Sequence, residues 1–137
     1  MRPNPRALPA ILTLALLAPT LAAASPIEFQ AKGAEPGSAV LELATEYPVT
    51  MTPIPFRLLI REANGRPITG AQVSCEMTMP AMKMPENRPR VKAREDHYGG
   101  ELMFTCAQGA WRISCEVART GHPRQTLVFD IDRVRMR

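Results

Sequence analysis

The sequence lacks the short motifs that mark the common enzyme classes. Its 137 residues contain no Gly-x-Ser-x-Gly turn, no His-Glu-x-x-His metal motif and no phosphate-binding glycine loop. Histidine is scarce, because His97 and His122 are the only two and neither has a second histidine at metal-ligand spacing. A nucleophile–base pair of Cys106 with His97 would lack a third, orienting group. We therefore predict a protein that is not an enzyme.

Strong charge and long apolar runs are also missing from most of the chain. The formal net charge is +4, and loss of the N-terminal Arg2 and Arg6 would leave +2, an excess too small to indicate nucleic acid as a partner. Beyond residue 24 no segment is apolar enough to span a bilayer. No stretch there has a helical period either, and the 14 prolines oppose helices.

The N-terminus has the pattern of a secretory signal. Two arginines precede an apolar run from Leu8 to Leu21, and Ala22 to Ala24 supply the small residues of a cleavage site. We predict a signal peptide at 1–24, cleaved after Ala24, and hence a periplasmic protein. An uncleaved membrane anchor is the alternative, and the shortness of the run and its prolines disfavour it.

Most of the remaining sequence alternates between apolar and polar residues with a period of two, which is typical of β-strands. After an irregular lead-in at 25–37, the domain at 38–137 reads as about seven short strands joined by turns such as Asn64-Gly65. This pattern predicts an all-β, immunoglobulin-like antiparallel β-sandwich. The predicted strands are 40–44, 56–61, 73–79, 91–93, 98–106, 111–117 and 127–131.

Three cysteines in an exported chain leave one unpaired if two form a disulfide. The third and sixth strands of an immunoglobulin-like sandwich are antiparallel neighbours. If Met79 lies opposite Trp111, that register places Cys75 opposite Cys115, and an oxidising compartment favours their disulfide. A shift of one residue would instead leave two free thiols. If Cys75 and Cys115 form the disulfide, Cys106 is the unpaired cysteine.

Four of the eight methionines lie between Cys75 and Pro85. Thioether sulfur is a soft ligand that suits copper(I), and a thiolate is another. The assumed topology brings the loop after the third strand close to Cys106. The predicted copper(I) ligands are Met79, Met82, Met84, Cys106 and Met77.

Other roles for these sulfur residues stay open at this point. Methionine also fills irregular gaps in a core, as expected for Met77, and forms adaptable protein-contact surfaces. Cys106 can be a small buried apolar residue or a redox-active thiol. His97 could add a ligand to the site, although a surface histidine is the simpler interpretation.

Several segments between Phe56 and Val117 together resemble the YtkA-like domain family, which is related to the FixH-like proteins. The resemblance rests on Asn64 to Val73, Met77 to Met84, Tyr98-Gly99-Gly100, Phe104, and Gly109-Ala-Trp111-Arg-Ile113. It implies an exported or membrane-tethered sandwich linked to copper handling or to haem-copper oxidase assembly. The FixH-like branch usually retains a membrane helix, whereas this N-terminus reads as cleavable. The chain also carries Cys106 where methionine is common in the family.

We therefore expect an exported, periplasmic copper(I)-binding or copper-trafficking protein that uses a Met-rich loop. Its expected partners are the copper ion and a membrane or periplasmic protein, and not nucleic acid. The alternative is a module that binds no metal. Its Met-rich loop would contact a membrane complex during the assembly of an oxidase or transporter.

Overall fold

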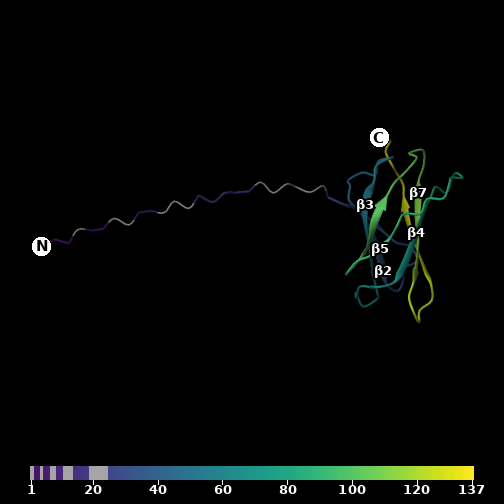
Figure 1. The fold of residues 1–137 in the computed structure, drawn as a ribbon, viewed down its shortest axis with the longest axis horizontal. Helices are drawn as coiled ribbons and strands as arrows, with labels where there is room; N and C mark the ends of the chain where they lie inside the picture. Colours follow the sequence, from purple (N-terminus) through teal and green to yellow (C-terminus); the bar gives the residue numbers. More distant parts are fainter. Residues whose placement is uncertain (1, 4, 7–8, 11–13, 19–24) are drawn as a thin grey trace.

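Figure 1 shows the computed structural model, which describes residues 2–3, 5–6, 9–10, 14–18 and 25–137. The predicted signal segment at 1–24 is thus described only in part, and its cleavage point after Ala24 lies outside the described residues. Within the described part, no helix has the length and apolar character needed to cross a membrane. The signal peptide stays a prediction.

Eight strands form two antiparallel sheets, and the described residues contain no helix (Figure 1). The sheet orders are β1-β2-β3-β6-β5 and β4-β7-β8. Apart from the added edge strand β1, these orders match the ABED and CFG sheets of an immunoglobulin constant domain. The predicted β-sandwich is confirmed. The strands are β1 (Ile27–Gln30), β2 (Ser38–Leu43), β3 (Ile54–Arg61), β4 (Gln72–Thr78), β5 (Lys92–Ala93), β6 (Tyr98–Leu102), β7 (Trp111–Ala118) and β8 (Gln125–Ile131).

Two boundaries differ from the prediction. The lead-in at 25–37 is not wholly irregular, because β1 pairs there with β2 and half-buries Ile27 and Phe29. Four residues carry too little alternation to be recognised as a strand in the sequence alone. The strand predicted at 98–106 ends at Leu102, because Phe104 forms a separate bridge with Thr50.

The core lies between the inward faces of the two sheets. Alternation places Leu41, Leu58 and Tyr98 on one inner face and Ile113 and Phe129 on the other, and all five are at most 2% exposed. Burying an apolar side chain of this size contributes about 1.5–3 kcal/mol relative to leaving it in water. The hydrophobic pattern therefore fixes which face of each strand is inside.

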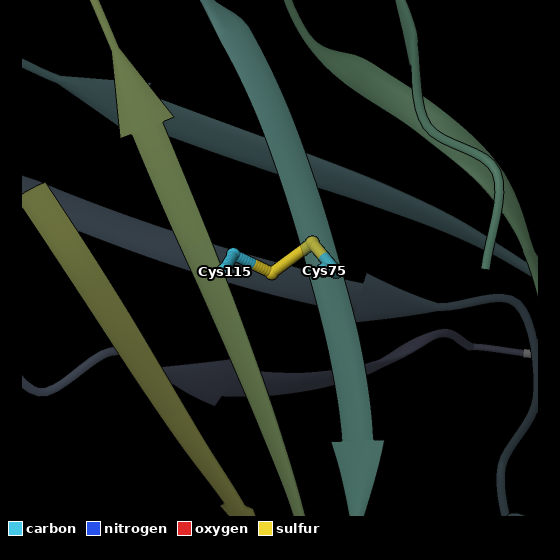
Figure 2. The surroundings of a disulfide bond; sticks show 2 residues. All are labelled: Cys75 and Cys115. Atoms are coloured by element: carbon cyan, nitrogen blue, oxygen red, sulfur yellow. A yellow bond between two sulfur atoms is a disulfide. The ribbon is translucent and has the colours of Figure 1, made fainter. Parts of the chain in front are cut away.

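A disulfide joins Cys75 of β4 to Cys115 of β7 (Figure 2). The two residues are register partners, and the same register continues to Thr78 opposite Arg112. The pairing predicted from the sequence is confirmed. Unlike the disulfide of antibody domains, which joins the two sheets, this one joins neighbours within one sheet.

Strand direction sorts the connecting segments into two ends of the sandwich. β3 begins opposite the last residue of β6, and β4 ends close to the start of β7. Hydrogen bonds tie the segments of the first end together, from Met51 N–H to the Phe104 carbonyl at 2.8 Å and from Thr50 N–H to the Arg135 carbonyl at 2.9 Å. We name this end, formed by 44–53, 79–91, 103–110 and 132–137, the sulfur end. We name the opposite end, formed by 31–37, 62–71, 94–97 and 119–124, the glycine end.

Candidate metal-binding end of the sandwich

The Met-rich loop begins where β4 leaves its ladder. Met79 is the first residue beyond the strand and is only 3% exposed. Proline cannot donate to a ladder, so Pro80 ends the pairing and the chain turns. The amide N–H of Met82 donates to the Met79 carbonyl at 3.2 Å, which closes the turn and leaves the Met82 side chain 46% exposed.

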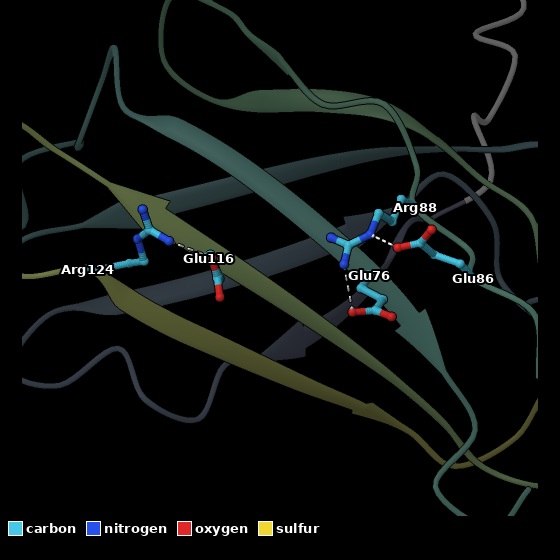
Figure 3. Close-up of polar contacts among 5 residues, drawn as sticks. All are labelled: Glu76, Glu86, Arg88, Glu116 and Arg124. Carbon is cyan, nitrogen blue, oxygen red and sulfur yellow. Dashed lines mark hydrogen bonds and ion pairs between the residues drawn. The ribbon is translucent and has the colours of Figure 1, made fainter. Parts of the chain in front are cut away.

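The loop returns to the outer edge of β4 and is anchored there. The Met77 amide N–H donates to the Asn87 carbonyl at 2.8 Å, and the Asn87 side-chain amide donates to the Met103 carbonyl at 3.2 Å. Arg88 pairs with Glu76 of β4 at 3.4 Å and with Glu86 in the loop (Figure 3). These pairs raise the Arg88 pKa, with the Glu86 hydrogen bond as the largest cause. Both ends of the Met-rich loop are therefore fixed.

The turn that carries Cys106 lies beside the start of this loop. The Trp111 indole N–H donates to the Cys106 carbonyl at 2.8 Å, and Trp111 packs edge-on against Phe104 with ring centroids 5.3 Å apart. The Met79 methyl carbon lies 3.4 Å from the position that a Cβ on Gly109 would take. Met79 thus contacts the turn that holds the free thiol.

Cys106 is half-buried and is the free cysteine of the described residues. Its Sγ accepts a backbone hydrogen bond from Gln108 at 3.5 Å. Because the turn is held by Trp111, the sulfur is kept at the sulfur end without being sealed into the core. Such a partly accessible soft donor suits a metal-binding role, and it equally suits a thiol that reacts slowly.

The five predicted ligands differ in accessibility. Met77 is fully buried on the inner face of β4, and Met79 is buried at the strand end. Met84 and Cys106 are half-buried against the core, and Met82 is exposed. The structure therefore brings four sulfur residues to one end, with Met77 behind them in the core.

The sequence prediction did not include three further methionines at this end. Met51, Met103 and Met136 are 53%, 36% and 74% exposed. They stand alone in three separate segments, so no spacing in the sequence connects them. Counting strand directions would have placed all three at the end of the sandwich where the Met-rich loop lies.

The exposed large apolar side chains of the folded domain share this location. In residues 25–137 they are Tyr47, Met51, Met82, Met103 and Met136. All five lie in sulfur-end segments, and four are methionines. Exposed apolar side chains gathered in one place indicate an interaction or ligand site rather than random surface composition.

A protein-family model described as YtkA-like matches residues 31–116. The chain belongs to the YtkA-like family. No curated protein and no solved structure matches it. The resemblance seen in the sequence is thus confirmed for the YtkA-like family, and the relation to FixH-like proteins stays a prediction.

The YtkA-like match covers most of the sulfur end and both disulfide cysteines. It includes Met51, the Met-rich loop, Met103 and Cys106, and it ends at Glu116 within β7. Strand β8 and the C-terminal segment with Met136 lie beyond it. The family model therefore describes the loop, the thiol, Met51 and Met103, and Met136 lies outside it.

Neither histidine of this YtkA-like chain lies at the sulfur end. His97 lies in the turn between β5 and β6 and His122 in the turn between β7 and β8, both at the glycine end. His97 Nδ1 lies 2.7 Å from Asp96 Oδ1, and this hydrogen bond lowers the Asp96 pKa. Among the described residues, no three His, Cys, Asp or Glu side chains form a group that could hold a metal ion.

Proposed function

We propose that this YtkA-like protein binds copper(I) at the sulfur end and carries it as cargo, as a binding protein rather than an enzyme. The observation that carries the proposal is the convergence of sulfur. Every methionine of residues 25–137 other than Met77 lies in a sulfur-end segment, and so does the free thiol. Thioether and thiolate are the ligands that select copper(I) over harder metals.

The donor set fits such an ion. Met82 offers an exposed thioether, Met84 and Cys106 offer partly accessible sulfur, and Met79 lies buried at the base of the loop. Met77 lies one inward position deeper and completes the set. The anchored loop supports binding, because a fixed backbone reduces the entropy lost when the ligands are ordered.

We also propose that the protein works outside the cytoplasm, after export through the N-terminal signal. The disulfide between Cys75 and Cys115 supports this, because disulfides persist in oxidising compartments such as the periplasm. There the protein would exchange copper(I) with a membrane or periplasmic protein partner. The exposed methionines at the sulfur end would meet that partner first.

A competitive copper(I) titration of the purified protein under anaerobic, reducing conditions tests the proposal. We expect near-stoichiometric binding tighter than micromolar. Replacing the three loop methionines with leucine (Met79→Leu, Met82→Leu, Met84→Leu) should weaken it at least about 100-fold, or about 2.7 kcal/mol. Leucine conserves volume, so the fold should survive, with a cost under about 1.5 kcal/mol per buried site.

The matched control changes the glycine end instead. The double variant His97→Asn, His122→Asn removes both histidines of the chain and should leave copper(I) affinity unchanged. Equal affinity in wild type and the leucine triple variant would contradict the proposal, provided that both show the same folded circular-dichroism spectrum.

The second candidate function is a protein-contact module that binds no metal. It has support in the exposed apolar side chains at the sulfur end, because methionine also suits adaptable contact surfaces. The two functions differ in their response to a copper(I) chelator. A partner captured from membrane extract equally well with and without the chelator would favour the contact module, and chelator-sensitive capture would favour copper transfer.

A further inference from the structure

Three methionines outside the Met-rich loop come together around one short extended segment. Pro48 to Met51 runs between Phe104 on one side and Arg135 on the other. The Arg135 amide N–H donates to the Pro48 carbonyl at 2.8 Å, and the Thr50 N–H donates back to Arg135. The three segments that carry Met51, Met103 and Met136 are therefore hydrogen-bonded neighbours.

Two of the methionines flank a buried bridge. Thr50 pairs with Phe104 in parallel, and both are buried, at 6% and 0% exposed. Met51 follows Thr50 and Met103 precedes Phe104, and both methionines are exposed beside the buried bridge. The Met51 amide N–H donates to the Phe104 carbonyl at 2.8 Å, so the two exposed side chains leave adjoining stretches of backbone.

Met136 lies on the other side of the same segment. Val49 pairs with Arg135, which places Met136 beside Thr50, and the Arg137 N–H donates to Thr50 Oγ1 at 3.2 Å. The C-terminus is thereby fixed next to Met51. All three methionine residues are more than a third exposed, so solvent and ions can reach this surface.

Met51 has a second unusual property. Its φ is +55°, and no other non-glycine among the described residues has a positive φ. A left-handed conformation costs a side chain such as methionine about 1–2 kcal/mol, and glycine would avoid that cost. Such outliers concentrate at functional sites. A methionine kept in this conformation, and exposed, points to a use for its sulfur.

We propose that Met51, Met103 and Met136 form a second copper(I)-binding position, made of thioethers alone, beside the Met-rich loop. It rests on the proposed function, because the ion is the same. The bond from the Asn87 side chain to the Met103 carbonyl joins the two positions through the backbone. The exposed position would receive copper(I) first, and the loop with Cys106 would hold it.

Methionine methyl NMR tests the two positions separately. The protein is labelled with carbon-13 at its methionine methyl groups, each signal is assigned by single Met→Leu variants, and copper(I) is added anaerobically. We expect the Met77, Met79, Met82 and Met84 methyls to shift during the first equivalent and the Met51, Met103 and Met136 methyls during the second. In the variant Met51→Leu, Met103→Leu, Met136→Leu the second equivalent should be lost and the first kept.

Each of the other outcomes overturns the second position, the loop as the binding site, or both. Loop methyls that shift while the other three stay fixed would overturn the second position and leave the proposed function standing. Seven methyls that shift together within one equivalent would also overturn it, because they would indicate one shared site. Shifts confined to Met51, Met103 and Met136 would instead overturn the loop as the binding site, and no shift at all would overturn both.

Discussion

The sulfur end and the glycine end of the sandwich are built from the same strands but from different residues. The glycine end holds all four glycines with positive φ, and its turns carry both histidines and no sulfur. The sulfur end has no such glycine, and its single positive-φ residue is Met51. One end therefore uses residues that suit tight turns, whereas the other places a methionine even where glycine would fit the backbone better.

This difference separates turns that the fold requires from exposed methionines that it does not require. Turns that only reverse the chain are well served by glycine and asparagine, as at Asn64-Gly65, where Gly65 has a φ of +84° and its N–H donates to the Glu62 carbonyl at 2.9 Å. Four methionines left exposed in the loops of one end serve no folding purpose, because apolar surface is stabilised by burial.

The largest expected effect tests whether both ends unfold as one unit. Cys75→Ala, Cys115→Ala removes a cross-link between residues 40 apart in sequence, which in the chain-entropy relation stabilises by about 4 kcal/mol. Urea unfolding should show that loss. Trp111 fluorescence at the sulfur end and a probe at Tyr98 near the glycine end should still change together.

Cys106→Ala is the matched control for the disulfide variant, because it removes a half-buried thiol without removing a cross-link. It should cost less than about 1.5 kcal/mol. Transitions that separate between the two probes in the disulfide variant would show that the two ends are stabilised independently.

A medium effect is expected from exchanging backbone preferences between the ends. Gly65→Ala puts a side chain at φ +84° with nothing within 4 Å of the new Cβ, so conformational strain alone should destabilise it by about 1 kcal/mol. At Met51 the native residue is itself the one with a side chain at positive φ, so glycine should relieve the strain. Met51→Gly should therefore be about 1 kcal/mol more stable than Met51→Ala. Thermal or urea unfolding of the variants measures both differences.

The strain interpretation of Met51 would be wrong if the alanine variant were as stable as the glycine variant. If both variants also bind the second equivalent of copper(I) more weakly than the wild type, whatever their stability, the contrast would be sharper. Gly65 would then serve through its backbone conformation and Met51 through its sulfur.

The smallest expected effect concerns a surface carboxylate outside both ends. Hydrogen bonds from Lys32 and then Arg112 lower the Asp130 pKa below its usual 3.8. A lowered folded-state pKa gives stability that is present above the unfolded pKa and lost as pH falls through the folded value. Asp130→Asn should therefore cost about 0.5 kcal/mol at pH 7, and the cost should vanish in strong acid.

Urea unfolding of Asp130→Asn at pH 7 and at about pH 2 measures this dependence. Asp132→Asn, which removes an exposed neighbouring carboxylate, is the control and should have little effect at either pH. A cost for Asp130→Asn that is equal at both pH values would show that its ion pairs do not contribute.

Much of the fold follows directly from the sequence. A period-two pattern identifies strands because alternate side chains face opposite sides of a sheet, and it located seven of the eight. The Cys75–Cys115 disulfide followed from two strands and one register. The strand β1 was missed, because its four residues gain their order from pairing with β2 and not from their own pattern.

The candidate site was predictable only where its residues are close in sequence. Met79, Met82 and Met84 could be grouped because they share one loop, and Cys106 joined them through an assumed topology that the register of β4 and β7 supports. Met51, Met103 and Met136 could not be grouped in that way. Their proximity depends on parallel bridges between segments more than 30 residues apart.

The sequence by itself determined seven of the eight strands, their inward faces, the disulfide and the sulfur-rich loop, because each follows from local alternation or from a single pairing of two strands. Only the tertiary structure decided that Met51, Met103 and Met136 lie on neighbouring segments, which methionines are buried, and that both histidines lie at the glycine end. The physical reason is that loops meet through the directions of strands distant in the chain, and no local pattern of residues encodes those directions.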